Sequence, residues 1–396
     1  MLALLKYPFI KAQKPHKSSP RDLRFELLRL LAMFLIVLCH ASIHLAQLNY
    51  RDSLPHSIYR TVANSGQIGV SIFFIISGYF CCKSKFNSGR ILKVILHTWL
   101  YSITIATIIF LSFYLFHCPQ TIAMMSKQDI WYNISLSAMP ILRNAYWFLT
   151  AYALILMPFT PLLNTFIEHV SKQRFKSILY IAYILTGLSY FIMPTIKTYV
   201  VISYPVVMYL TGSYIRLYAK DIKLSNLKLW CSIVGGIVAM WLINYFGTSN
   251  TISRIFGDQF SHILLYCNSI LVPQWIIAAA ITIIATRRKP MMGTNRLSKL
   301  IRICGASTFG VYLIHENPLL YQPLWNFINR SLAPLSELSG IYRLLIVLGS
   351  SIMIFIVCIT ISIIYDVLVT NRLVNTIIKL QFMQKLTHKL DCAMNS

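Results

Sequence analysis

The chain alternates long apolar segments with short polar loops. The apolar segments lie at about 26–48, 66–82, 92–116, 145–167, 177–194, 198–215, 229–246, 260–286, 304–328 and 344–370. Most of them approach or exceed the ~20 residues that an α-helix needs to cross a bilayer. The pattern predicts an all-α, polytopic transmembrane bundle of about ten spans.

The loop charges predict the orientation of this bundle. With the N-terminus inside, every inside segment carries at least three Lys or Arg, and no outside loop carries more than two. Because cytoplasmic loops are enriched in these residues, both termini are expected in the cytoplasm. The chain then divides into an N-terminal tail (1–23), a transmembrane domain (24–371) and a C-terminal tail (372–396), and is expected to be a multi-pass protein of the inner or plasma membrane.

Composition agrees with a bilayer as the main partner. Hydrophobic residues make up 57% of the chain and charged residues 12%, against about 25% charged in a soluble domain. The net charge of +25 lies mainly in short loops, so it indicates topology and not nucleic-acid binding. The nine cysteines show no ligand spacing beyond an adjacent pair, and we expect no bound metal or cofactor.

The first apolar segment carries ionisable residues where lipid disfavours them. Glu26, Arg29, His40 and His44 interrupt it. At 100° per residue, Arg29 and His40 lie about 20° apart around a helix and roughly 16 Å apart along it. Ionisable residues inside a membrane usually face the interior of the bundle or a water-filled cavity, and they often belong to a functional site. The alternative is that they hold helices together by hydrogen bonds.

Three further segments contain candidate residues. Ser77 lies in a Gly- and Ser-rich segment whose simplest interpretation is close helix packing. Trp147 begins a span that contains Pro158 and Pro161, and a Trp there is often an interface anchor. His315 and Glu316 stand inside the segment at 304–328, with Tyr312 one turn earlier. Since both cannot face lipid at acceptable cost, that helix is expected to line a polar space.

These residue types favour proton-transfer chemistry. Histidine can exchange protons near neutral pH, so His40, His44 and His315 are candidate bases. Carboxylates such as Glu26 and Glu316 could orient or balance them, and Arg29 could bind an anion. The chain has no Walker loop, zinc signature or dinucleotide fingerprint, which argues against ATP-driven transport and common redox cofactors.

Four stretches, taken in order, resemble the acyltransferase-3 family of integral-membrane O-acyltransferases. They are RFELLRLLAMFLIVLCH at 24–40, GVSIFFIISGYF at 69–80, YWFLTAYALILMPFTPLLN at 146–164 and STFGVYLIH at 307–315. Arg29 and His40 match the opening Arg and His of the family, and His315 matches its late His. The chain departs from many members at the start of the first helix, where it has Glu26 and not Asp.

The resemblance implies transfer of an acyl group, expected to be acetyl, from cytoplasmic acyl-CoA to a sugar hydroxyl. The acceptor would be an envelope polysaccharide or a lipid-linked glycan precursor. His40 is the preferred base, with His315 and Glu316 as the other catalytic candidates. Arg29, with Glu26 and Arg24, is expected to bind the co-substrate acetyl-CoA, and Ser77, Trp147 and Tyr312 are expected to bind substrate.

The main competing class is a transporter or flippase for a glycan or lipid carrier, which also uses buried charged residues but often shows internal repeats. The two halves of this chain show no convincing repeat. A catalytically inactive relative is a third interpretation, disfavoured by the presence of both Arg29 and His40. The sequence sets neither the acceptor nor the oligomeric state.

Overall fold

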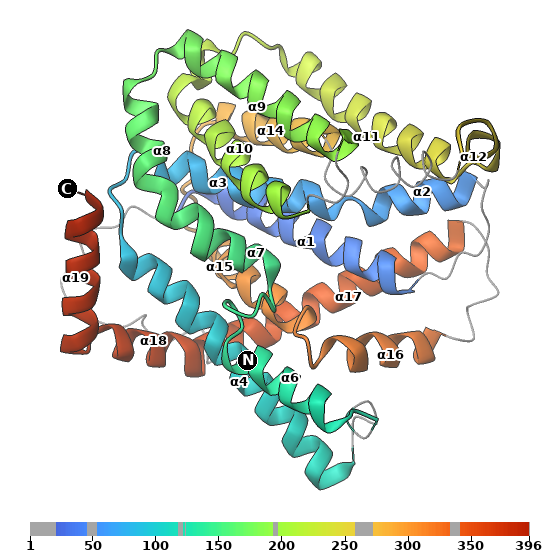
Figure 1. Ribbon diagram of the computed structural model, residues 1–396, viewed down its shortest axis with the longest axis vertical. Helices are drawn as coiled ribbons and strands as arrows, with labels where there is room; N and C mark the ends of the chain where they lie inside the picture. The colour runs from blue at the N-terminus through green and yellow to red at the C-terminus, as the bar shows by residue number, and fades with distance from the viewer. Residues whose placement is uncertain are drawn as a thin grey trace.

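The computed structural model describes residues 21–45, 54–117, 122, 124–192, 197–257, 272–332 and 341–395. These residues form helices, turns and loops, without a strand among them. Most helices run side by side in a bundle, and α4 (Ser88–Phe116) projects from it together with α6 (Lys127–Ala138) (Figure 1). The C-terminal helix α19 (Gln381–Asn395) crosses the end of the bundle at a steep angle (Figure 1). The all-α prediction is confirmed.

The long helices follow the predicted segments closely. They are α1 (Leu23–Leu45), α3 (Gly66–Cys81), α4, α8 (Met157–His169), α9 (Lys172–Ile192), α10 (Lys197–Tyr218), α11 (Asn226–Thr248), α14 (Val272–Arg287), α15 (Arg296–His315) and α17 (Ile341–Tyr365). Among the described residues, seven helices are long and apolar enough to cross a membrane. The predicted segment at 260–286 begins outside the described residues, and the count of ten spans stays a prediction.

The helical path continues past the predicted start of the C-terminal tail at residue 372. Behind α17 come a short π-helical segment, η5 (Asp366–Thr370), and α18 (Asn371–Ile378). The predicted N-terminal tail lies outside the described residues up to residue 20. At the other end, α1 begins at Leu23, within one residue of the predicted domain start.

The predicted segment at 304–328 is not a single helix, so placing His315 and Glu316 in the middle of one was wrong. Helix α15 ends at His315, and α16 (Tyr321–Leu332) begins after a turn. The turn is built by Asn317, whose Oδ1 accepts hydrogen bonds from the backbone N–H groups of Leu319 and Leu320 at 3.0 and 3.3 Å. Pro318 follows Asn317 directly and lacks an N–H group, so the helix cannot continue through it.

Helix α3 is the centre of the bundle and packs between α1 and α10. Two glycines permit this approach. A Cβ on Gly69 would lie 2.2 Å from the carbonyl oxygen of Ala32 in α1, and one on Gly78 would overlap the backbone of Tyr209 in α10. This confirms the prediction of a closely packed helix, and it fixes α3 firmly against the ionisable face of α1.

The span that contains Pro158 begins irregularly. A single α-helical turn, α7 (Trp147–Thr150), passes into the π-helical segment η2 (Ala151–Leu156) and then into α8. Pro158 lies in the first turn of α8, where a missing N–H is tolerated. Short π-helical segments are frequent near functional sites. This one directly follows Trp147 and Phe148, two residues of the site described next.

Candidate active site

A cavity of about 230 Å³ lies between α1, α3, α7 and α15. Four helices from distant parts of the sequence supply its wall, which is largely apolar with a few polar and charged side chains. The lining residues are Arg21, Arg29, Met33, Ile36, Cys39, His40, Gly66, Gln67, Val70, Phe73, Trp147, Phe148, Gly305, Ala306, Thr308, Phe309 and Tyr312. The cavity therefore follows the face of α1 from Arg29 to His40, three turns of helix.

One end of the cavity is defined by arginines around a buried carboxylate. Arg29 Nη1 donates a hydrogen bond to Glu26 Oε1 at 2.6 Å, and Arg21 Nη1 lies 3.9 Å from the same oxygen. Glu26 is 1% exposed and packs on Gly305 of α15, where a Cβ would lie 2.3 Å from its Oε2. Glu26 thus orients the two guanidinium groups, which leaves their remaining donors available to an anion.

At the other end, three titratable side chains meet. His40 Nδ1 lies 2.9 Å from His315 Nε2 and 3.1 Å from Glu316 Oε1. His40 lines the cavity, whereas His315 is completely buried behind it. The end of α15 therefore brings a second histidine and a carboxylate into contact with Nδ1 of His40.

The hydrogen bonds determine which ring nitrogens carry protons. His315 Nδ1 lies 2.6 Å from the carbonyl oxygen of Val311. A carbonyl oxygen only accepts, so His315 Nδ1 is protonated and Nε2 of a neutral His315 is an acceptor. His40 Nδ1 must then donate to His315 Nε2. In a neutral His40 this leaves Nε2 unprotonated, which is the form a general base requires.

Glu316 is incompletely satisfied in this arrangement. Its Oε1 is buried and has no hydrogen-bond partner among the described residues, although His40 Nδ1 is only 3.1 Å away. A neutral imidazole gives this carboxylate little electrostatic compensation. If His40 gained a proton, the two groups would become an ion pair, so Glu316 would stabilise the imidazolium more than the imidazole.

A buried tyrosine joins the aromatic wall of the cavity to the end of α15. Tyr146 is 1% exposed, and its hydroxyl donates to the carbonyl oxygen of Leu313 at 3.1 Å. The same hydroxyl accepts a 2.9 Å hydrogen bond from Asn317 Nδ2. Tyr146 directly precedes Trp147 and its ring packs near that of Tyr312, with centroids 5.7 Å apart. These bonds hold both aromatic lining residues in register with His315.

Residues 22–364 match the sequence model of an acyltransferase domain, Acyl_transf_3. This region contains all four helices that line the cavity. The chain belongs to the acyltransferase-3 family. Comparison with curated proteins and with solved structures gave no match.

Within this acyltransferase-3 protein, Arg29, His40, Trp147 and Tyr312 line the cavity, and Glu26, His315 and Glu316 contact lining residues. Ser77 is not among the lining residues. Its hydroxyl donates to the carbonyl oxygen of Phe73 in its own helix at 2.9 Å. His44 lies one turn beyond His40 and packs against Tyr321 and Trp325 of α16, with ring centroids 4.6 and 4.9 Å apart. It is not among the lining residues.

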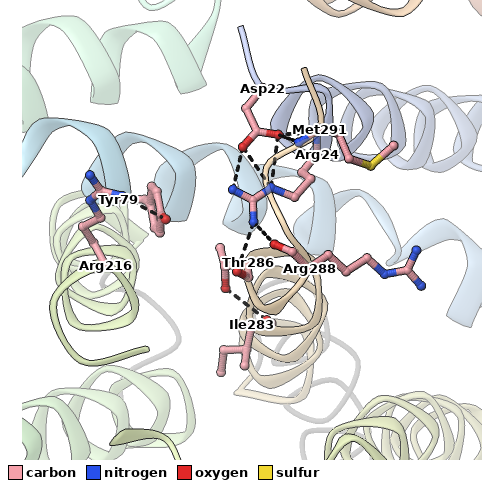
Figure 2. Close-up of polar contacts among 8 residues, drawn as sticks. All are labelled: Asp22, Arg24, Tyr79, Arg216, Ile283, Thr286, Arg288 and Met291. Carbon is pink, nitrogen blue, oxygen red and sulfur yellow. Dashed lines mark hydrogen bonds and ion pairs between the residues drawn. The ribbon is translucent and has the colours of Figure 1, made fainter. Parts of the chain in front are cut away.

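Arg24, which was expected to bind the co-substrate, is not among the residues that line the cavity. Figure 2 shows its guanidinium between the carboxylate of Asp22 and the end of α14. Nε and Nη2 bind Asp22 at 2.9 and 2.5 Å, and Nη1 donates to the carbonyl oxygens of Thr286 and Arg288. With these donors occupied, Arg24 fastens the start of α1 to the loop after α14.

The sequence reasoning missed Arg21 and Gln67, which also line the cavity. Arg21 falls in the segment interpreted as a tail, and Gln67 stands in a segment interpreted as packing only. Among the described lining residues, Gln67 has the only side-chain amide. A lone amide inside the Gly- and Ser-rich segment was a usable signal. The position of Arg21, about two helical turns before Arg29, was a weaker one.

The acyltransferase-3 site also contains a set of groups able to hold a metal ion. One ligand atom each from His40, His315 and Glu316 lies within 4.8 Å of the others. Two imidazoles and a carboxylate suit Zn²⁺. An ion bound at His40 Nδ1 would force the proton of the neutral ring onto Nε2, so metal binding and a base at Nε2 exclude one another. The expectation of a metal-free enzyme stays a prediction.

Proposed function

We propose that the protein is a membrane O-acyltransferase that moves an acetyl group from cytoplasmic acetyl-CoA to a sugar hydroxyl of an envelope polysaccharide or a lipid-linked glycan. One observation supports this proposal above the others. A single cavity is lined by free guanidinium donors at one end and by the ring of His40 at the other. A donor that carries phosphates at one end and a thioester at the other matches this distribution of charge.

The proposed reaction is a direct transfer. Arg29 and Arg21 bind phosphates of acetyl-CoA, and the acyl-bearing arm extends along the apolar wall toward His40. Nε2 of His40 removes the proton of the acceptor hydroxyl as its oxygen attacks the thioester carbonyl carbon. The carbonyl π electrons move onto oxygen. Collapse of this oxyanion expels the thiolate of CoA, which takes the proton from His40.

His315 and Glu316 act through His40 in this scheme. His315 accepts a hydrogen bond from Nδ1–H of His40 and so keeps Nε2 of His40 unprotonated. His315 is therefore a positioning residue and not a second base. Glu316 compensates the imidazolium that forms during attack. Trp147 and Tyr312 form the aromatic wall where the thioester and the acceptor meet, and aromatic faces suit sugar rings and acyl chains alike.

Mass spectrometry of the cell-surface glycan tests the proposal. Cells that produce the protein should carry a glycan heavier by one acetyl group per modified sugar than cells without it. A glycan of identical mass but altered amount at the surface would support a transporter or flippase. His40 in the cavity wall favours the enzyme over the transporter. Acyl transfer requires a proton acceptor there, whereas movement of a glycan does not.

A further inference from the structure

Gln67 is a polar lining residue whose side-chain amide oxygen lacks a hydrogen-bond partner among the described residues. It lies in the first turn of α3 and lines the cavity together with His40. Its Oε1 is buried and has no hydrogen-bond partner among the described residues. A buried amide oxygen without a partner is unfavourable. A half-turn of the terminal amide exchanges this acceptor oxygen for the two N–H donors of Nε2, so the same position can present a donor to a ligand. Such a group is retained at a functional site when a ligand completes its hydrogen bonds.

The packing of α3 fixes Gln67 at the depth of His40. Gly66, which precedes Gln67, packs against Cys39, which precedes His40. A Cβ on Gly66 would lie 2.7 Å from the Cβ of Cys39. One turn further, Gly69 packs on the backbone of Ala32. These two contacts set the register of α3 on α1 and place Gln67 at the level of His40 in the cavity wall.

Three other polar lining groups are less suited to stabilise a negatively charged oxygen beside His40. Thr308 spends its hydroxyl on the carbonyl oxygen of Gly305 at 2.9 Å. Arg29 is held by Glu26 three turns away. A Cys39 thiol is a weak donor. Gln67 offers two amide N–H groups, and no hydrogen bond within the described residues fixes its amide.

We propose that Gln67 donates a hydrogen bond to the carbonyl oxygen of the thioester and stabilises the oxyanion that develops there. The inference rests on the proposed acyl transfer. His40 and Gln67 would then serve the two partners of the reaction separately, the base acting on the hydroxyl and the amide on the carbonyl. Donors aimed at a developing oxyanion contribute mainly to kcat.

The experiment compares Gln67→Met, which keeps the length of the side chain without its amide, with Gln67→Glu, which keeps the shape but removes the donors. Thr107→Val is the control, since Thr107 lies outside the cavity on α4 and its hydroxyl is already bonded to the carbonyl oxygen of Ile103 at 2.9 Å. Purified protein in lipid nanodiscs receives labelled acetyl-CoA and glycan extracted from cells that lack the protein. Both Gln67 variants should lose about 10²- to 10³-fold in kcat. Their KM for acetyl-CoA and their melting temperature should stay close to those of the control.

Different results overturn different claims. If Gln67→Met keeps kcat within threefold of the wild-type value, Gln67 only fills space. If the loss appears in KM for acetyl-CoA alone, Gln67 binds the donor in its ground state and is not an oxyanion donor. If neither the wild-type protein nor Thr107→Val transfers label, the proposed function fails before Gln67 is tested.

Discussion

His315 Nε2 lies 2.9 Å from His40 Nδ1, and His315 Nδ1 lies 2.6 Å from the carbonyl oxygen of Val311. This chain of two hydrogen bonds has only one consistent direction when both rings are neutral. It sets the tautomer of His40 from a helix more than 270 residues away in sequence. A buried partner that fixes a ring tautomer is a recurring device where histidine acts as a base.

Substitution of His315 should therefore depend on whether the new side chain accepts a hydrogen bond. In His315→Gln, the amide oxygen can accept a hydrogen bond from Nδ1–H of His40, so part of the activity should survive. Glu316 Oε1 lies 3.1 Å from the same nitrogen and could replace His315 as the acceptor. The second variant is therefore His315→Leu with Glu316→Leu, which leaves no acceptor beside Nδ1, and its loss should approach the 10²- to 10⁴-fold range expected for a lost base. Steady-state rates of acetyl transfer compare the two. Equal activity of both variants would contradict the positioning role.

The two arginines near the start of α1 should differ in their effects. Arg29→Lys keeps the charge beside Glu26 but loses the planar fork that suits phosphate, so KM for acetyl-CoA should rise about 10-fold or more. Arg24→Ala should leave that KM unchanged and lower the melting temperature, because Arg24 binds Asp22 and backbone carbonyls. A calorimetric binding measurement and a melting curve on each variant separate the effects. A raised KM in Arg24→Ala together with an unchanged KM in Arg29→Lys would contradict the roles assigned to Arg24 and Arg29.

Zinc should inhibit the enzyme if His40 is a base at Nε2. An ion held by His40, His315 and Glu316 moves the proton of the neutral imidazole to Nε2. Acetyl transfer should fall as Zn²⁺ is added and return when a chelator removes it, and Zn²⁺ should bind more weakly to Glu316→Gln. Chelation should not reduce the activity of metal-free protein. Loss of activity on chelation, restored by Zn²⁺, would show that the metal takes part in catalysis.

Asp22 should stabilise the fold in a pH-dependent way. Burial acts to raise the pKa of Asp22, but hydrogen bonds from Arg24 and from the backbone N–H of Met291 outweigh it, and the pKa falls below its ordinary 3.8. A lowered pKa means that the contribution is complete above that ordinary value and is lost as the pH falls through the folded-state value. Asp22→Asn should cost about 1–3 kcal/mol at neutral pH.

Melting curves of purified Asp22→Asn from neutral pH to below pH 3.8 measure this contribution. The difference from the wild-type protein should shrink toward the acid end. Glu168→Gln is the control, since Glu168 is exposed on α8 and should show no such trend. A difference that is constant with pH would mean that Asp22 acts through packing alone.

Much of the site could be predicted because one helix carries its pattern. The spacing of Arg29 and His40 alone places them on one face of α1, and the structure puts both in one cavity. The end of α15 was harder to predict from the sequence, because apolar residues occur on both sides of Asn317 and Pro318. That dipeptide is a turn signal, and it directly follows the end of α15, where His315 and Glu316 contact His40.

The remaining features depend on contacts between distant segments. Arg24 and Arg29 look equivalent in sequence, and only the position of the loop after α14 diverts Arg24 to Asp22. Gln67 looks like a lone polar residue until Gly66 is seen against Cys39. Helix packing of this kind is set by small residues whose partners cannot be read from one sequence.

Transfer of label from acetyl-CoA to the glycan, measured for wild-type protein and for His40→Gln side by side, tests the central claim most directly. Gln can replace the hydrogen bonds of a structural histidine but does not titrate. The account predicts labelled glycan with the wild-type protein and a loss of about 10²- to 10⁴-fold with His40→Gln at equal folded amount. Near-normal transfer by His40→Gln would contradict it.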